Sequence, residues 1–202
     1  MIAVEVGRHE LADSIVDVGK YLVQVIGQRY TAELDKIIAV GDGTTQPQGI
    51  VNASGLATMP NISNGLGPMA LADLEQLYFG CAKQYRRPEF RCAFLSNDVT
   101  YSRCRAIPVG ADDARRVLGQ DEGSYDALSA PYRISNDLPN TTLIFGALAR
   151  YRFYRRQGQE MRWVTEGQTL ALKNTALLVS TMRAGGRVMD TNAFVAETNA
   201  PA

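Results

Sequence analysis

The chain has 202 residues, of which 46% are hydrophobic and 21% are charged, and its 21 basic side chains equal its 21 acidic ones. No apolar run reaches the roughly 20 residues of a membrane span, and the apolar content is too high for a disordered chain. A net charge of zero excludes a global field that attracts nucleic acid or anionic lipid, so any such contact must be local. The 17 arginines against 4 lysines favour fixed contacts with carboxylates at packed surfaces.

The first expected element is a long helix from Glu10 to Ala39, because its apolar residues recur every three or four positions. At about 1.5 Å per residue, this helix would be roughly 45 Å long and would act as an architectural element. Gly19 and Gly27 fall near one face of it, where they either admit a neighbouring backbone or are simply tolerated. An apolar stripe on the helix needs a cover and consists of Leu22, Ile26, Leu34 and Ile38.

The segment from Gly41 to Gly49 is rich in glycine and proline, which predicts that the helix ends and the chain turns there. A second amphipathic helix is expected from Leu71 until shortly before Pro88, followed by a buried strand from Phe90 to Leu95. Asn97 or Asp98 is placed to cap a short helix that runs through Ile107. This order of helix, strand and helix predicts an α/β core.

The stretch from Arg115 to Ser129 is polar and predicts a loop, whereas the remainder of the chain is rich in short strands. Turn signals separate these strands at Gln157-Gly158 and Gly185-Gly186, which predicts antiparallel hairpins. We expect the hairpins to pack with the long helix, with the only tryptophan, Trp163, partly buried. The expected strands are Tyr132–Ile134, Leu143–Phe145, Tyr151–Tyr154, Met161–Val164 and Ala176–Met182.

Few residues are suited to catalysis. His9 is the only histidine, so it has no second histidine for a metal cluster or a dyad. Gly41-Asp42-Gly43-Thr44 follows a helix and lacks the lysine of a phosphate loop, which favours an ordinary turn. The paired carboxylates Asp112-Asp113 and Asp121-Glu122 lie in the polar stretch and are more typical of a solvated loop than of acid/base machinery.

The paired arginines could contact phosphate, but they lack interleaved aromatic residues, so solvated or interface positions are favoured for Arg86-Arg87, Arg115-Arg116 and Arg155-Arg156. The three cysteines form neither a zinc pattern nor a disulfide framework, and Cys81 falls in the apolar register of a helix. The sequence therefore predicts no enzyme, no catalytic, cofactor-binding or metal-binding residues and no cofactor.

Several segments resemble the major capsid proteins of tailed bacteriophages, which share the Hong Kong 97-type fold. The run from Ile38 to Ile50 after the long helix is similar to the G-D-G-T-x-x-P-x-G-I turn after the spine helix of that family. Three other segments also resemble the family and follow one another in the family's order along the chain. They are Phe94–Asn97 with Arg103, Leu128–Tyr151, and Arg183–Val188 with Ala193-Phe194.

The resemblance implies an α+β fold with a long spine helix, an antiparallel peripheral sheet and an α/β axial domain. The expected peripheral domain comprises residues 1–40 and 150–183, and the expected axial domain comprises residues 41–149 and 184–202. Family members usually carry an N-terminal arm and an extended hairpin loop before the spine helix, and we expect this chain to lack both. It then corresponds to a shortened form of the family.

The function implied is that of a structural subunit of an icosahedral phage or prophage capsid, in pentamers and hexamers that enclose double-stranded DNA. The implied partners are copies of the chain, a scaffold, a head-maturation protease and packaged DNA contacted non-specifically, with no membrane. The protein would be made in the bacterial cytoplasm and would reside in the virion capsid. The alternatives are an encapsulin-like nanocompartment shell protein and a small α/β enzyme or ligand-binding protein.

Overall fold

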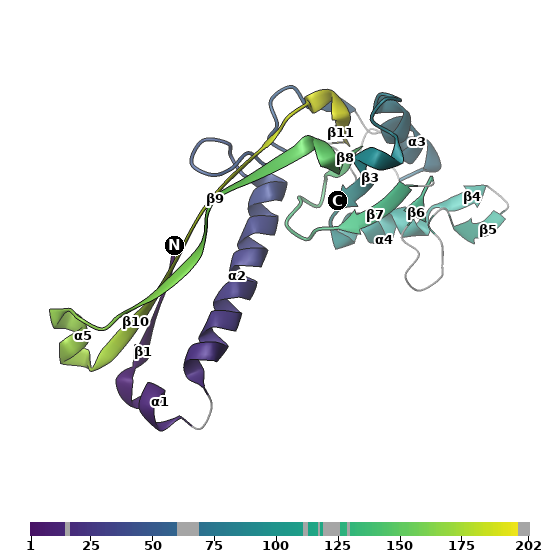
Figure 1. Cartoon of the computed structure of the whole chain (residues 1–202). Coiled ribbons are helices and arrows are strands. Elements are labelled where there is room, and N and C mark those ends of the chain that lie inside the picture. The colour runs from purple at the N-terminus through teal and green to yellow at the C-terminus, as the bar shows by residue number, and fades with distance from the viewer. Residues whose placement is uncertain are drawn as a thin grey trace. The chain divides into compact units, whose positions relative to one another are not determined.

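The computed structural model of the chain describes residues 1–14, 17–59, 69–110, 113–116, 118, 126–128 and 130–197. The chain divides into two compact units: residues 1–34 with 153–185, called unit 1, and residues 35–152 with 186–202, called unit 2. Helix α2 (Val18–Val40) and strands β9 (Tyr151–Val164) and β10 (Thr175–Val188) contribute residues to both units (Figure 1).

Unit 1 contains a three-stranded sheet in the order β1-β10-β9, with β1 spanning Ile2–Gly7. Strand β1 runs antiparallel to β10, from Ile2 opposite Ser180 to Gly7 opposite Thr175. The hydroxyl of Thr175 donates to a carboxylate oxygen of Glu5 at 2.8 Å across this pair. Strand β1 was not predicted, although Ile2, Val4 and Val6 alternate with Ala3 and Glu5 as a half-buried strand requires.

The predicted helix from Glu10 to Ala39 is wrong at its start, because the chain forms a short helix α1 (Arg8–Asp13) before α2 begins at Val18. Asp17 caps α2: its carboxylate accepts the backbone N–H of Lys20 at 2.9 Å, and its carbonyl accepts that of Tyr21 at 3.1 Å. A helix usually starts at a residue whose side chain accepts a hydrogen bond from the backbone N–H two or three residues further along the chain. The apolar spacing continues across this break, so periodicity alone did not reveal it.

The predicted turns at Gln157-Gly158 and Gly185-Gly186 are also wrong, since both pairs lie inside the continuous strands β9 and β10. Neither Gly158 nor Gly185 has the positive φ that a tight hairpin turn demands. The connection between the strands contains helix α5 (Gln168–Lys173), and its flanking residues Gly167 and Asn174 have φ values of 145° and 52°. Two long hairpin strands therefore replace the three shorter strands that were expected here, Tyr151–Tyr154, Met161–Val164 and Ala176–Met182.

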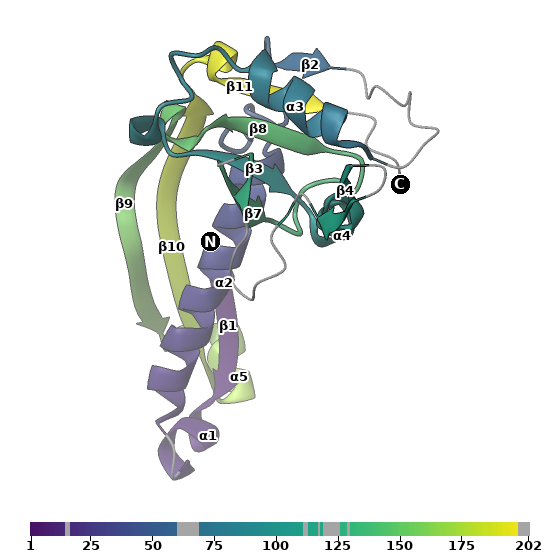
Figure 2. The same cartoon turned by 90° about the vertical axis from the view of Figure 1, so that its right-hand side faces the viewer.

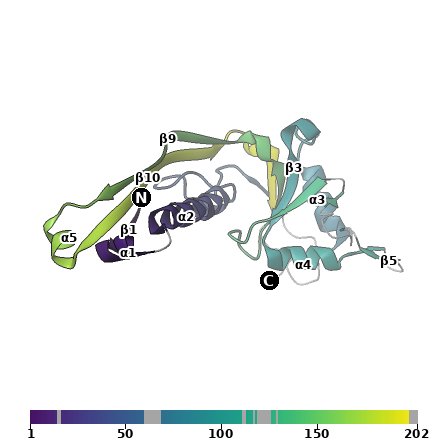
Figure 3. The ribbon, with the colours of Figure 1, turned by 60° about the horizontal axis from the view of Figure 1, so that its bottom comes forward.

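The part of α2 that belongs to unit 1 lies along the sheet (Figure 3). Ile26 is buried at 2% exposure, and the Tyr30 hydroxyl donates to the carbonyl of Ser180 on β10 at 2.9 Å. The predicted packing of helix against strands is confirmed at these residues. Trp163 is 42% exposed, which agrees with the partial burial predicted. A Cβ added at Gly27 would meet no described atom within 4 Å, so none of the described backbone approaches there.

Unit 2 is built on a mixed six-stranded sheet in the order β2-β11-β8-β3-β7-β6. The pairs β11/β2 and β3/β7 are parallel, whereas β11/β8, β3/β8 and β6/β7 are antiparallel. A separate antiparallel pair is formed by β4 (Pro108–Gly110) and β5 (Asp113–Arg116). The strands of the main sheet are β2 (Ala57–Met59), β3 (Cys92–Ser96), β6 (Asp126–Ala127), β7 (Ala130–Ile134), β8 (Leu143–Ala147) and β11 (Phe194–Glu197).

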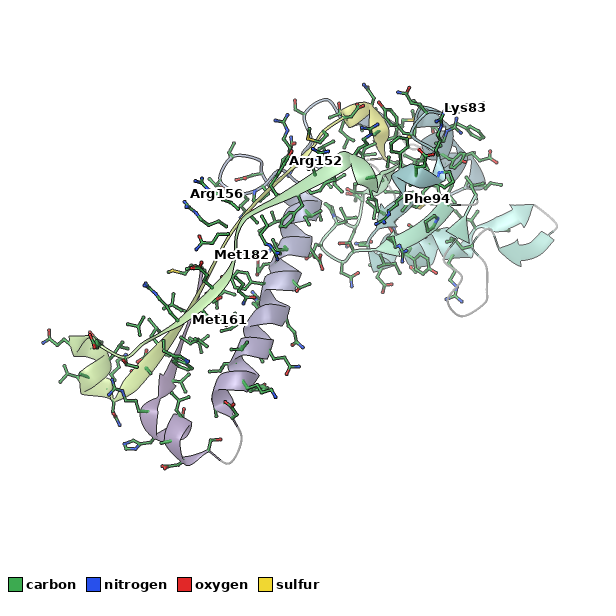
Figure 4. All side chains as sticks on the ribbon, in the orientation of Figure 1. Lys83, Phe94, Arg152, Arg156, Met161 and Met182 are labelled. Carbon is green, nitrogen blue, oxygen red and sulfur yellow. The ribbon has the colours of Figure 1, made fainter. Side chains whose placement is uncertain are left out.

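Helix α3 (Leu71–Gly80) lies against β8 and β11 of this sheet (Figure 2). All five residues of β8 are buried, as expected for a central strand covered on both faces. The rings of Phe94 and Phe145 lie 4.6 Å apart in the core, and Figure 4 places Phe94 among the strands, whereas Lys83 lies at the surface. Ile38 of α2 packs against this core, so the predicted apolar stripe is divided between the two units.

The predicted elements of unit 2 are confirmed in kind, but their ends differ. Helix α3 ends at Gly80, since Cys81 is extended, and the chain then turns through 82–87 into a 3-10 turn at Pro88–Phe90. Strand β3 consequently begins at Cys92. Of the two caps expected, Asn97 and Asp98, it is Asn97 that caps α4 (Asp98–Ala106), by accepting the N–H of Thr100 at 2.8 Å. Two further 3-10 turns lie at Leu148–Arg150 and Thr191–Ala193.

Candidate interaction surfaces

The turn after α2 is the most distinctive local structure that the sequence pointed to. The Asp42 carboxylate accepts the backbone N–H groups of Thr44, Thr45 and Gln46 at 3.0, 3.1 and 2.8 Å. These bonds, with one from the Thr45 hydroxyl as the largest cause, hold the pKa of Asp42 far below its usual value. The amides that a phosphate would require are already occupied by the chain's own carboxylate, which supports a turn over a phosphate loop.

Two glycines let the ends of this turn approach each other. The N–H of Gly49 donates to the carbonyl of Gly41 at 2.9 Å, and a Cβ on Gly41 would lie only 2.0 Å from the carbonyl oxygen of Pro47. The Asn52 amide donates to the carbonyl of Val40 at 2.8 Å, which satisfies the end of α2. The turn is therefore a structural junction within unit 2.

The cysteines and the histidine do not form a reactive cluster. Cys81 and Cys104 are fully buried, and burial is the main cause that raises the pKa of each thiol to about 11. The thiolate, which is the nucleophile, is thereby disfavoured, and the predicted core position of Cys81 is confirmed. His9 is exposed on α1. Across the described ranges, no three His, Cys, Asp or Glu side chains converge to hold a metal ion.

The paired charged residues lie in different parts of the structure. Arg155 and Arg156 are exposed on β9, where Figure 4 shows Arg156 projecting from the strand. The side chains of Arg115 and Arg116, and also of Asp113, lie outside what the structure describes, as do Asp112 and Asp121-Glu122. Of the expected loop from Arg115 to Ser129, residues 117, 119–125 and 129 are likewise outside the described residues. Only Arg86-Arg87 belongs to a recognisable concave surface.

This surface is a hollow of about 630 Å³ in unit 2, which we call the arginine pocket. Its wall contains Arg86, Arg87, Arg91 and Arg133, and no acidic side chain lines it among the described residues. Arg91 and Arg133 are 42 positions apart in the chain, and both line this hollow because β3, which begins directly after Arg91, pairs in parallel with β7, where Arg133 stands opposite Leu95. The sequence has no local pattern that indicates this strand pairing. Of the four arginines, only the adjacent pair Arg86-Arg87 was therefore singled out from the sequence.

A buried carboxylate lies elsewhere in unit 2. Glu197 on β11 is only 2% exposed, stands opposite Met59 of β2 and Leu143 of β8, and neither of its carboxylate oxygens has a hydrogen-bond partner within the described structure. Burial, and secondarily the negative charge of Asp73, raises the pKa of Glu197 from 4.5 to about 7. The carboxyl group is therefore held in its neutral form in weak acid.

This carboxyl predicts a pH dependence of stability. Because the folded-state pKa is raised, the folded chain retains a proton that the unfolded chain releases above pH 4.5, and stability falls as the pH rises from about 4.5 to 7. A shift of this size corresponds to a loss of at most about 3 kcal/mol. In urea titrations at pH 4.5, 6 and 8, Glu197→Gln should flatten this fall. The control Glu75→Gln, exposed on α3, should keep it; equal slopes in both variants would refute the assignment.

Unit 1 exposes more large apolar side chains than a solvated surface requires. On α2, Tyr21 is 61% exposed and Val23 is 46% exposed, and Leu172 on α5 is 81% exposed. Phe153, Tyr154 and Trp163 on the edge strand β9 are each between 38% and 49% exposed. Exposed apolar groups and an open strand edge are typical of surfaces that another chain covers.

A comparison with protein-family models connects these features to a known group. The model of the phage capsid family matches residues 1–198, which is nearly the whole chain. The chain belongs to the phage capsid family. It is therefore a capsid protein with a structural role, and its turn from Gly41 to Ile50 occupies the place after the spine helix that the sequence resemblance assigned to it. No curated protein matches the sequence.

Solved structures agree on the fold. The chain aligns with the capsid of an empty GTA particle at a TM-score of 0.80 and 18% identity, covering 97% of this chain and 69% of that one. It aligns with a Microbacterium phage Oxtober96 chain at a TM-score of 0.75 and 16% identity, covering 98% and 70%. A holo-SrpI encapsulin complex from Synechococcus elongatus PCC 7942 aligns at 0.69 and 15% identity, covering 99% and 72%.

These matches confirm the predicted α+β fold of the Hong Kong 97 type, with α2 in the position of the spine helix. They also place an encapsulin among the similar folds, as the alternative drawn from the sequence anticipated. The family assignment locates the protein in the virion capsid. Within the described residues, no helix is both long enough and apolar enough to span a membrane.

Proposed function

We propose that the chain is the repeated subunit of an icosahedral phage or prophage head, assembled in pentamers and hexamers around double-stranded DNA. The observation that carries this proposal is the family match over residues 1–198. Contacts that repeat around five-fold and six-fold axes are heterologous, which means that two different surfaces of each subunit meet. The exposed apolar groups of unit 1 and the arginine pocket of unit 2 are two such surfaces.

Unit 1 is then the peripheral domain and unit 2 the axial domain. The units, residues 1–34 with 153–185 and 35–152 with 186–202, lie close to the domains expected from the sequence. In this role the subunit acts through its contacts and needs no catalytic, cofactor-binding or metal-binding residue. It is synthesised in the bacterial cytoplasm, and its assembly partners include a scaffold and a head-maturation protease, with packaged DNA contacted non-specifically.

A cellular nanocompartment shell is the second candidate, and the alignment with the encapsulin complex favours it. Both candidates use the same fold and both require self-association. They differ in what the shell contains, since a phage head holds DNA and a nanocompartment holds cargo protein. The contents of the particle therefore separate them.

The test is electron microscopy of particles purified from cells that produce the chain together with the other head proteins. We expect shells with five-fold and six-fold capsomers that contain this chain and DNA protected from nuclease. Shells with protein cargo and no protected DNA would favour the nanocompartment. Absence of the chain from every purified shell would contradict both.

A further inference from the structure

Glu197 at the end of β11 has an unusual environment for a carboxyl group. Its side chain is almost fully buried, and neither carboxylate oxygen has a hydrogen-bond partner among the described groups. A second buried carboxylate, that of Asp73 on α3, acts on it through its negative charge and accepts the backbone N–H of Ala70 at 2.8 Å. A buried charge without a partner is costly, so the packing around Glu197 is stable only while its carboxyl group is neutral.

No basic group offsets this carboxylate in the part of the chain that the structure describes. The buried thiol of Cys104 on α4 also interacts with Glu197, and burial raises its pKa to about 11, so it stays neutral. The neighbours in register, Met59 of β2 and Leu143 of β8, are apolar. Residues 60–68 and 198–202, which follow β2 and β11 in the sequence, contain no charged side chain. Without a nearby cation, ionisation of the carboxyl group requires that water reach it.

Strand β2 lies between Glu197 and the edge of the sheet. It is the outermost strand next to β11, and the two pair in parallel from Ala57 opposite Val195 to Met59 opposite Glu197 (Figure 2). Neighbours in register on paired strands point their side chains to the same face of a sheet. Met59 lies against α3, since a Cβ added at Gly80 would collide with its Cε. Glu197 and Met59 therefore share the face that α3 covers.

Strand β2 is also the element around this carboxyl group that is held least firmly. Ala57 and Thr58 are exposed, and Met59 is only partly buried. In contrast, α3 contributes the fully buried Leu74 and Leu77 to the core, and β8 is buried along its whole length and paired on both sides. Elements with few buried apolar contacts open most readily by local unfolding. The least costly path for water to the carboxyl group is therefore movement of β2.

We infer that Glu197 controls a pH-sensitive latch, formed by residues 57–59 and 195–197: when its carboxyl group ionises, β2 separates from the end of β11 while β3, β7 and β8 stay paired. The closed latch binds the proton more tightly than the open one, so the latch is closed in weak acid and opens more often as the pH rises. Opening moves Met59 away from α3 and leaves β11 as the edge of the sheet. The latch is a property of the single chain and does not depend on the proposed shell function.

The test is amide hydrogen exchange of the purified full chain in low concentrations of urea, with rates corrected for the effect of pH on unprotected amides. The latch should exchange through an opening that urea hardly promotes, because little surface is exposed, whereas β3 should exchange through global unfolding, which urea promotes. The pKa of Glu197 is about 7 in the closed latch and 4.5 in water. The corrected exchange of the latch should therefore rise about tenfold or more from about pH 5.5 to about pH 8.5.

Two substitutions remove the titratable group in different ways. Glu197→Gln keeps the shape of the neutral carboxyl group, and Glu197→Met provides an apolar side chain if the unpaired amide unfolds the chain. In either variant the corrected exchange of the latch should change less than about twofold between the two pH values. Glu75→Gln, exposed on α3, is the matched control and should keep the rise seen in the unmodified chain. Circular dichroism checks that each variant is folded.

Two outcomes would overturn the inference. Equal urea dependence of exchange in the latch and in β3 would mean that β2 leaves β11 only when the whole of unit 2 unfolds. A rise with pH that persists in the Glu197 variants would assign the pH effect to another group. Loss of the rise in these variants alone supports the latch whether or not the chain is found in shells, so the electron microscopy of particles tests the proposed function separately.

Discussion

Gly41→Ala is expected to lower the free energy of unfolding by about 3 kcal/mol, the upper end of the usual cost of an added group at a packed site. A Cβ at this position would lie 2.0 Å from the carbonyl oxygen of Pro47 and 2.6 Å from that of Ile37. The Ile37 carbonyl accepts a hydrogen bond from Gly41, and Pro47 lies in the short segment that a second bond, from Gly49 to Gly41, closes, each at 2.9 Å. The collision can be relieved only by opening the turn, and the turn leads into the core residue Ile50.

Gly27→Ala is the matched control for this prediction. Gly27 lies inside α2, whereas Gly41 directly follows the last residue of that helix, and a Cβ at Gly27 would meet no described atom within 4 Å. Alanine is favoured over glycine inside a helix by up to about 1 kcal/mol, so this variant should be unchanged or slightly more stable. Urea denaturation of both variants provides the measurement. A small effect of Gly41→Ala, equal to that of Gly27→Ala, would show that the turn is not packed as described.

The turn also illustrates what sequence can predict. Its glycines, its proline and Asp42 are adjacent in the chain, and each acts on neighbours within ten residues. The same holds for the Asn97 cap, which reaches Thr100 only three residues away. Local chemistry of this kind can be read directly from residue order, and both features were predicted correctly.

The predicted turns and the predicted start of the long helix were wrong because strand pairing and a helix cap determined the structure there, and not the local sequence pattern. Gly158 and Gly185 resemble turn residues, yet each remains extended because it belongs to a long strand paired with a neighbour. Asp17 interrupts the helix that apolar spacing alone would continue. The arginine pocket could not be predicted either, since Arg91 and Arg133 line one hollow only through the pairing of β3 with β7.

Ile26→Ala is expected to cost about 3 kcal/mol, within the usual range of roughly 2 to 5 kcal/mol for a buried aliphatic residue. Ile26 is 2% exposed and is the only α2 residue of unit 1 in the described hydrophobic core. One turn later, Tyr30 is bonded to Ser180 of β10, so this face of the helix lies on the strand. Truncation would leave a cavity that the sheet, held by its backbone pairing to β1, cannot fill.

The neighbouring positions give a graded control for Ile26. Leu22 is only partly buried, so Leu22→Ala should cost less than Ile26→Ala, whereas Gln24 and Gln28 are exposed and their alanine variants should change stability by no more than about 0.5 kcal/mol. Thermal melts of the four variants would establish the order. Small and equal changes in all four would mean that α2 draws its stability from contacts outside its own chain, and the packing of helix on sheet would no longer explain how unit 1 holds together.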